Sequence, residues 1–214
     1  MKKIIVATAA LFASHIAVAG NWYVGLGLGS ARVEDTSNNI TAGTSKLAQN
    51  GIVNITSSDV HSSAMSLLVG YGFNSHIAAE FDYNDLGSYE MHGYTGPGST
   101  PPYGWEHDDV DALSLSAVLT APLSEYFALY GRLGPAITND EARTCISNVR
   151  WCDHTSDTKF GPLVGAGAWF TFPRLIGAFR FDIDRFNNVG TDNNEASAGR
   201  FTTLQFQYVY TFER

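Results

Sequence analysis

The sequence alternates large apolar side chains with small or polar ones, at a period of two residues, in eight separate stretches. The last stretch, LQFQYVYTFER, places large apolar side chains at Leu204, Phe206, Tyr208, Tyr210 and Phe212. Because successive side chains of a β-strand point to opposite faces, this period predicts a strand with one bulky face. The same period recurs at 21–30, 62–73, 77–87, 112–121, 127–137, 160–170 and 176–184. The chain is also rich in glycine (21 residues) and aromatics (13%), a composition that favours an all-β protein.

The connections between these stretches are predicted to alternate in length. Short turns follow the second, fourth and sixth stretches, at about 74–76, 122–126 and 172–175. Long loops follow the odd-numbered stretches, at about 31–62, 87–110, 139–158 and 185–201. Short turns at one end and long loops at the other are the plan of a small outer-membrane barrel. Each stretch offers about the 9–11 residues that a tilted strand needs to cross a bilayer.

The two faces of the predicted strands differ in a way that favours lipid on the outside. Eight strands enclose a lumen only wide enough for side chains to fill, and rows of inward Leu, Phe and Tyr would overfill it. Glycine, serine, threonine and a few pairable charges fit the lumen better, so we expect the bulky face to point outward into lipid. The predicted fold is an all-β, eight-stranded, antiparallel, up-and-down transmembrane β-barrel. A secreted soluble barrel with its apolar face inside is the alternative. The predicted inward charges are Glu80, Asp82, Arg132, Arg180, Asp182 and Asp184.

The N-terminus has the pattern of a secretory signal peptide. Lys2 and Lys3 precede an apolar run at 4–12, and Ala17-Val18-Ala19 forms a small-residue cleavage site. We expect residues 1–19 to be removed after export by the Sec pathway, leaving 20–214 as one barrel domain. Of the 13 basic residues 11 then remain against 21 acidic ones, a formal charge of −10. Nucleic-acid binding needs a basic surface, so we expect none.

Three spans carry a resemblance to a known family: VGYGFNSHIAAEFDYNDLG (69–87), LTAPLSEYFALYGRLG (119–134) and FRFDIDRFNNVG (179–190). Together with the closing aromatic strand, they resemble the transmembrane domain of OmpA and related small outer-membrane barrels. The resemblance runs over essentially the whole mature chain and implies a monomer in a Gram-negative outer membrane, inserted by the barrel-assembly machinery. We expect the protein to be without the periplasmic peptidoglycan-binding domain of OmpA. It also continues with Glu213 and Arg214 after Phe212, where family members usually end on the aromatic.

The resemblance also implies a role for the inward charges. In the family such residues form a salt-bridge network that plugs the barrel, and Glu80, Arg132, Arg180 and Asp182 match its charged inward sites. One interpretation is a polar core, in which ions pair because an unpaired buried charge is costly. The other is a gate, in which exchange of partners opens a narrow ion path.

Two cysteines lie close together in the third predicted loop. Cys145 and Cys152 belong to TCISNVRWC, and the oxidising compartment implied by the signal peptide predicts a disulfide. His154 leaves a C-x₆-C-x-H metal site open, although this spacing matches no familiar zinc pattern. We therefore expect no metal and no cofactor.

The histidines do not form a recognisable catalytic set. His61, His92, His107 and His154 are predicted in loops, and His76 in a turn. A barrel deacylase would need a histidine on a lipid-facing strand, and RFNNVG has none; a barrel palmitoyltransferase would need His, Asp and Ser at the outer rim. The nearest cluster is WEHDD (105–109), which we interpret as a solvated acidic loop. We expect no enzyme activity.

Two function hypotheses follow. In the first, the protein is a structural barrel whose loops contact host surfaces or phage and serve adhesion or colonisation. The loop at 87–110 contains Tyr89, Tyr94, Tyr103 and Trp105, a composition found where proteins contact partners. Acidic groups at the rim could share divalent cations with lipopolysaccharide phosphates. In the second, the protein is a narrow channel or a lipid-modifying enzyme.

Overall fold

The structure, a computed structural model, describes residues 21–34, 54–56, 61–94, 103–146, 151–172, 176–189 and 199–212. None of the described residues forms a helix long and apolar enough to span a membrane. The predicted signal peptide and the Glu213-Arg214 tail lie outside the described residues. The strands are β1 (Asn21–Val33), β2 (Asn54–Thr56), β3 (His61–Gly72), β4 (Ile77–Tyr94), β5 (Tyr103–Pro122), β6 (Phe127–Ile146), β7 (Trp151–Thr171), β8 (Ala178–Val189) and β9 (Gly199–Thr211).

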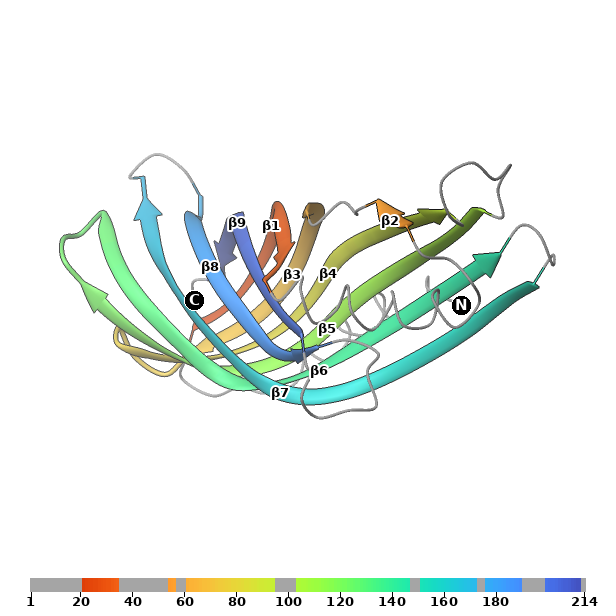
Figure 1. The fold of residues 1–214 in the computed structure, drawn as a ribbon. Coiled ribbons are helices and arrows are strands. Elements are labelled where there is room, and N and C mark those ends of the chain that lie inside the picture. Colours follow the sequence, from red (N-terminus) through yellow and green to blue (C-terminus); the bar gives the residue numbers. More distant parts are fainter. Residues whose placement is uncertain are drawn as a thin grey trace.

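Eight of these strands close into an antiparallel barrel (Figure 1). The neighbours around the ring are β4, β3, β1, β9, β8, β7, β6 and β5, and β5 pairs back onto β4. The C-terminal strand β9 pairs with the first strand β1, from Tyr23 opposite Thr211 to Val33 opposite Phe201. The predicted fold class is therefore confirmed. The short strand β2 is an addition that pairs only with the far end of β4.

Large apolar side chains cover the outside of the barrel. The outward residues of β9 are 38–54% exposed, whereas Gln205, Gln207 and Val209 between them are buried. We call this outward surface the apolar belt. At the end of the barrel away from the short turns, which we call the upper end, the belt reaches to Leu28, Met65, Tyr83, Leu113, Ile137, Phe160, Ile183 and Leu204. Within this edge, Leu28 pairs with Met65, Tyr83 to Phe160 pair in succession through Leu113 and Ile137, and Ile183 pairs with Leu204. Outward residues beyond this level are polar or charged on most strands, as at a membrane surface.

The end of the barrel opposite the upper end, which we call the lower end, has two of the three predicted short turns; the third, at about 172–175, lies mostly outside the described residues. In the first, Asn74 accepts backbone hydrogen bonds at its Oδ1 from His76 N (2.8 Å) and Ile77 N (2.9 Å). In the second, Leu123 N donates to Phe127 O at 3.0 Å. Side-chain and backbone partners thus satisfy these turns locally, which allows consecutive strands to be joined by so few residues.

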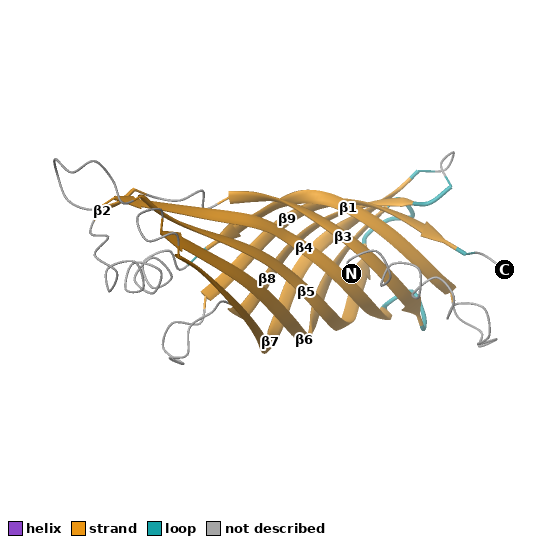
Figure 2. Ribbon diagram, turned by 90° about the vertical axis from the view of Figure 1, so that its right-hand side faces the viewer, coloured by secondary structure: helices purple, strands orange, loops and turns teal. Residues whose placement is uncertain are grey.

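The upper end differs from the prediction. The segments at 87–110 and 139–158 are mostly strand rather than loop, because β4 runs to Tyr94, β5 begins at Tyr103, and β6 and β7 leave only 147–150 between them. The histidines at 61, 92, 107 and 154 likewise lie in strands. Both faces carry polar residues here, so no apolar period marks the strands. Figure 2 shows β4 to β7 reaching beyond the other strands at this end.

The interior is packed in layers, and the upper layer is more apolar than predicted. The centre holds the charged side chains. Above them lies a buried apolar cluster in which Tyr89 meets the ring of Phe201 edge to face at 5.3 Å. Leu86, Leu163 and Phe186 are fully buried in the same cluster. Four alanines complete it and make room for these large side chains: Ala31, Ala64, Ala112 and Ala136.

Strands β5 and β6 approach each other closely at Gly134, and a substitution there tests this contact. A Cβ added to Gly134 of β6 would lie 1.9 Å from the Leu115 carbonyl oxygen and 2.7 Å from Ser116 Cα. We expect Gly134→Ala to destabilise the barrel by about 1–3 kcal/mol, because backbone atoms must move apart. The measurement is the fraction of compact, heat-modifiable protein on unboiled SDS gels across a urea series.

The matched control is Gly131→Ala in the same strand. There the nearest atom to an added Cβ is the Gly165 carbonyl oxygen at 3.8 Å, an ordinary contact. Equal urea midpoints for the two variants would contradict the observed approach of β5 and β6. Identical mobility with and without boiling would contradict the barrel itself.

Candidate functional site

A buried network of charged side chains fills the centre of the barrel, and Arg132 of β6 is one of its two cations. Its Nε donates to Asp184 Oδ1 at 2.7 Å, and Nη2 also binds the Asp184 carboxylate, which makes a two-pronged pair. Nη1 donates to Asp82 Oδ1 at 3.0 Å and lies 3.4 Å from Glu80 Oε2. One guanidinium therefore joins carboxylates from β4 and β8 across the lumen.

Arg180 of β8 is the second cation. Its Nη1 donates to Glu80 Oε1 at 2.5 Å, and Nη2 donates to Asp182 Oδ1 at 3.0 Å. Nε and Nη2 also lie 3.1 and 2.9 Å from the Tyr130 hydroxyl oxygen, to which they donate. The guanidinium carbon lies 4.5 Å from the centre of the Tyr130 ring and 4.8 Å from that of Trp169. Two aromatic rings thus contact the guanidinium group in addition to its carboxylate partners, as in cation–π pairs.

Glu80 links the two arginines. It accepts hydrogen bonds from both guanidinium groups and, at Oε1, from the Tyr23 hydroxyl at 2.7 Å. The structure thus brings all six predicted lumen charges together, with the ion-paired side chains fully shielded from solvent. The aromatic partners Tyr23, Tyr130 and Trp169 were not predicted, although their inward positions follow from the two-residue period.

The network has more carboxylates than cations. Four acidic side chains face two guanidinium groups, and Asp82 Oδ2 and Asp182 Oδ2 make no hydrogen bond to any of the described residues. Each arginine is therefore shared, and neither can be removed without leaving carboxylates uncompensated. A row of amides continues the polar lumen beside it, as Gln207 Nε2 donates to Gln205 Oε1 and Gln205 Nε2 donates to Asn84 Oδ1.

The two cysteines lie at the far end of the β6–β7 hairpin rather than in a loop. Cys145 and Cys152 are directly opposite one another, with Cα atoms 4.2 Å apart, and form a disulfide. Among the described residues, no group of three or more His, Cys, Asp or Glu side chains is arranged to hold a metal ion. The disulfide therefore serves to fasten the hairpin tip.

The cluster around WEHDD is part of strand β5, so its interpretation as a loop was wrong. His107 Nδ1 lies 3.2 Å from Glu90 Oε1, and its Nε2 lies 3.6 Å from Asp109 Oδ1. Ser88 Oγ donates to Asp109 Oδ1 at 2.6 Å. A nucleophilic serine needs its base within hydrogen-bond reach, and here the serine bonds to the carboxylate instead of the imidazole. The cluster lacks the geometry of a hydrolase triad.

Outward charges just above the apolar belt are separated by sign. We call these residues the collar. Its acidic side chains lie on β4, β5 and β6: Asp85, Asp109, Asp111 and Glu141. The next row outward on these strands contains both signs, with Glu90, His107 and Arg143 in register. The basic side of the collar lies on β1, β8 and β9: Arg32, Arg185 and Arg200. The strand order puts these two groups on opposite sides of the barrel. The basic side also holds Glu34, whose Oε2 lies 2.9 Å from Arg185 Nη2.

The shared arginines make the network sensitive to truncation. We expect Arg132→Ala to lower the free energy of unfolding by about 3–5 kcal/mol, since it leaves buried carboxylates without a partner. Urea unfolding in lipid vesicles, followed by tryptophan fluorescence, measures the loss. Arg143→Ala, on the exposed face of the same strand, is the control and should change the value by less than about 0.5 kcal/mol. Equal losses in both variants would contradict the network.

Known structures with the same barrel share little sequence with this chain. The attachment invasion locus protein Ail of Yersinia pestis is 16% identical, with a TM-score of 0.53 over 91% of this chain and 100% of that one. Ail was also solved with the heparin analogue sucrose octasulfate. Neisserial surface protein A is 11% identical, with a TM-score of 0.52 over 89% of this chain and 97% of that one. OprG of Pseudomonas aeruginosa is 11% identical, with a TM-score of 0.53 over 90% of this chain and 96% of that one.

These likenesses show the fold, and the family assignment comes from the sequence. No curated protein matches the chain in a sequence search. The family model described as the OmpA-like transmembrane domain matches residues 17–214, which is nearly the whole chain. Its members are outer-membrane barrels, as the belt and the closed sheet require. The chain belongs to the OmpA-like transmembrane domain family.

Proposed function

We propose that this protein is a structural outer-membrane barrel whose paired hairpins form an extracellular interaction surface. The observation that carries the proposal is the length of β4 to β7, which have 18–21 residues against 12–13 for the other barrel strands. About 9–11 residues suffice to cross the membrane, so the rest of each long strand stands outside it. Paired strands hold a surface in one shape, which lowers the ordering cost of binding a partner.

The hairpins present a mainly polar and acidic surface. Trp105 is half-buried, and Glu90, Ser88 and Arg143 are exposed. Tyr89, predicted as a contact residue, points into the barrel, and its hydroxyl donates to the Leu86 carbonyl oxygen at 3.0 Å. Burial raises the pKa of this phenol well above its usual range, and a nearby carboxylate, Asp85, adds to the effect. We therefore assign Tyr89 to the core and not to a binding surface.

Similar proteins support a surface role. Ail is named for attachment and invasion, and one of its structures holds a heparin analogue. By analogy, we propose that the hairpins of this chain contact a host surface or phage and contribute to adhesion or colonisation. The family and the similar proteins are non-enzymatic barrels, and we propose that this chain is likewise not an enzyme.

The basic side of the collar suits the phosphates of outer-membrane lipid. Arg32, Arg185 and Arg200 are exposed immediately above the apolar belt, at the level of lipid head groups. We propose that they bind lipopolysaccharide phosphates through charge-assisted hydrogen bonds. We also propose that the protein is a monomer, exported by the Sec pathway and inserted by the barrel-assembly machinery.

Trimming one hairpin tests the surface role. The register pairs Tyr89 with Asp108, so residues 90–107 can be replaced by Asn-Gly, a two-residue turn, without changing the strands below. We expect cells that express this variant to lose binding to host cells or phage. The folded barrel should remain heat-modifiable and the membrane intact.

A second trimmed variant separates the two hairpins. Arg143 pairs with His154, so replacing residues 144–153 by Asn-Gly removes the tip of the β6–β7 hairpin together with the disulfide. Loss of binding in only one variant identifies the contacting hairpin. Unchanged binding in both, with the barrel folded, would refute the proposed surface role.

A narrow ion channel is the second candidate, and one observation favours it. Glu80 is shared by Arg132 and Arg180, so an exchange of partners could open a path through the network. We expect Arg132→Ala, purified as folded protein, to raise conductance in planar bilayers relative to Arg143→Ala. Equal, near-zero conductance in wild type and both variants would remove this alternative and leave the network as a plug.

A further inference from the structure

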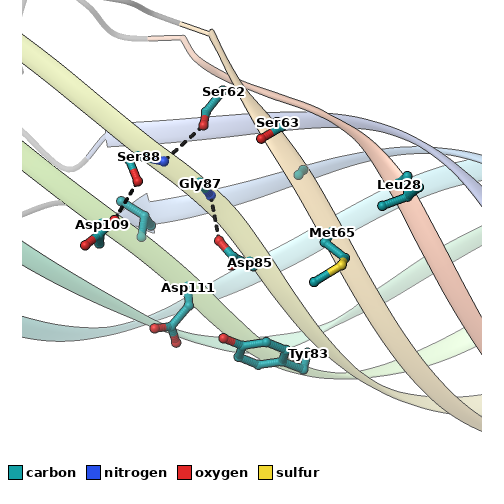
Figure 3. A pocket seen from close by; sticks show the side chains of 12 residues that line it. Leu28, Ser62, Ser63, Met65, Tyr83, Asp85, Gly87, Ser88, Asp109 and Asp111 are labelled. Carbon is teal, nitrogen blue, oxygen red and sulfur yellow. Dashed lines mark hydrogen bonds between the residues drawn. The ribbon is translucent and has the colours of Figure 1, made fainter. Parts of the chain in front are cut away.

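From a groove on the outside of the barrel, we infer a binding site for an amphiphile with an acyl chain and a cationic head group. The groove has a volume of about 600 Å³ and lies between β3, β4 and β5, where the apolar belt meets the acidic side of the collar (Figure 3). It does not depend on the proposed function of the hairpins, because its residues belong to the strands at the membrane surface.

The groove lies at a bulge in β4, where the pairing of β3 with β4 ends. Paired residues of β3 and β4 run from Gly72 opposite Ala78 up to Met65 opposite Asp85 and stop there. The β4–β5 register shifts between Asp85 and Gly87, where Gly87 has a φ of +80° and donates its N–H to Asp85 Oδ1 at 2.9 Å. An added Cβ at Gly87 would lie 1.9 Å from Ser62 Oγ. Only glycine therefore fits here, and the bulge changes the direction of the β4 side chains beyond the last β3–β4 pair.

The lower half of the groove is apolar. Leu28 and Met65, at the upper edge of the belt, are 69% and 55% exposed, and Tyr83 lies beside them. Leu28, Met65 and Tyr83, which Figure 3 labels among the lining residues, also belong to the outward apolar belt. An acyl chain lying against the belt can therefore enter the groove without leaving an apolar environment.

The upper half is negatively charged. Asp85, Asp109 and Asp111 all line it, and no lysine or arginine is among the lining residues. Ser88 binds Asp109 and Ser62 accepts a hydrogen bond from Ser88 N, so the polar wall is held in place by its own contacts. Three carboxylates at the head-group level complement a cation, and they repel the phosphate of an anionic lipid.

These features select one ligand class. The head group must be a cation, such as an amine or a quaternary ammonium, and the tail must be apolar and long enough to follow the belt downward. A phosphate bridged by a divalent cation is the competing occupant. It is less well matched, because the described residues contain no group of three acidic or histidine ligands arranged for a metal ion.

The inferred binding site is tested by a measurement that reports on individual residues. A hexadecyl trialkylammonium nitroxide is added to isotopically labelled protein in phosphatidylcholine nanodiscs, and paramagnetic broadening of backbone amide signals is measured by NMR. We expect the broadening at Gly87 and Ser88 to exceed that at Arg185 and Asn187, on β8 across the barrel, by about threefold, as an exposed ion pair would produce. Doxyl stearate, the anionic probe, should not show this difference.

Three variants determine whether the selective broadening depends on the carboxylates and on the groove. Asp109→Asn with Asp111→Asn should remove the selective broadening, since the amides keep the size and hydrogen-bonding oxygens of the carboxylates. Glu141→Gln with Asp153→Asn removes the same charge outside the groove and should preserve the effect. Ser63→Trp fills the groove and leaves all three carboxylates, so it should also abolish the effect.

Three results would overturn the inference. Equal broadening around the whole collar would mean nonspecific partition into the lipid. Selective broadening by the anionic probe in the presence of Mg²⁺ would assign the carboxylates to a cation bridge. Selective broadening that survives in Ser63→Trp would show that surface charge, and not the groove, attracts the probe. Each variant is compared only as folded, heat-modifiable protein.

Discussion

The structure depends on backbone hydrogen bonding in a solvent that offers no partners. Within hydrocarbon every N–H and C=O group must be satisfied by the protein, and a sheet can do this only when it has no free edge. Pairing of β9 with β1 closes the sheet and removes the edge. The outward apolar belt and the inward polar residues follow from this closure, since each strand then has one face in lipid and one in the lumen.

Closure at eight strands also determines how the interior is filled. The lumen is too narrow for water-filled space and wide enough for side chains, so charged residues on inward positions must find partners across it. Arg132 and Arg180 do so by sharing Glu80, while aromatic rings and amides occupy the remaining surface. The apolar layer above, built around Phe186 and Phe201, packs as the core of a soluble protein does. Because side chains fill the lumen, the functions proposed for this protein lie on the outer surface of the barrel.

Above the belt the strands are outside lipid, where water can satisfy backbone groups, and here the strands differ in length. β1, β3, β8 and β9 end near the membrane surface, whereas β4 to β7 continue as paired hairpins. The collar between belt and hairpins carries acidic residues on one side and basic residues on the other. The lipid contact proposed for the basic side and the amphiphile site proposed for the acidic side both rest on this distribution of charge, and the bulge at Gly87 lies in the groove on the acidic side.

The sequence by itself determined the eight strands, their faces and the membrane setting, because the two-residue period is local and the burial of each face follows from it. It also identified the residues of the charged network as inward. Their pairing needed the tertiary structure: Glu80 and Arg180 are 100 residues apart and meet only because the barrel closes. The hairpins beyond the belt were mistaken for loops, since outside lipid both faces of a strand are polar and the period disappears. The groove was also beyond local patterns, because it lies where the β3–β4 pairing ends beside a β4–β5 register shift, and both depend on how β4 pairs with its two neighbours.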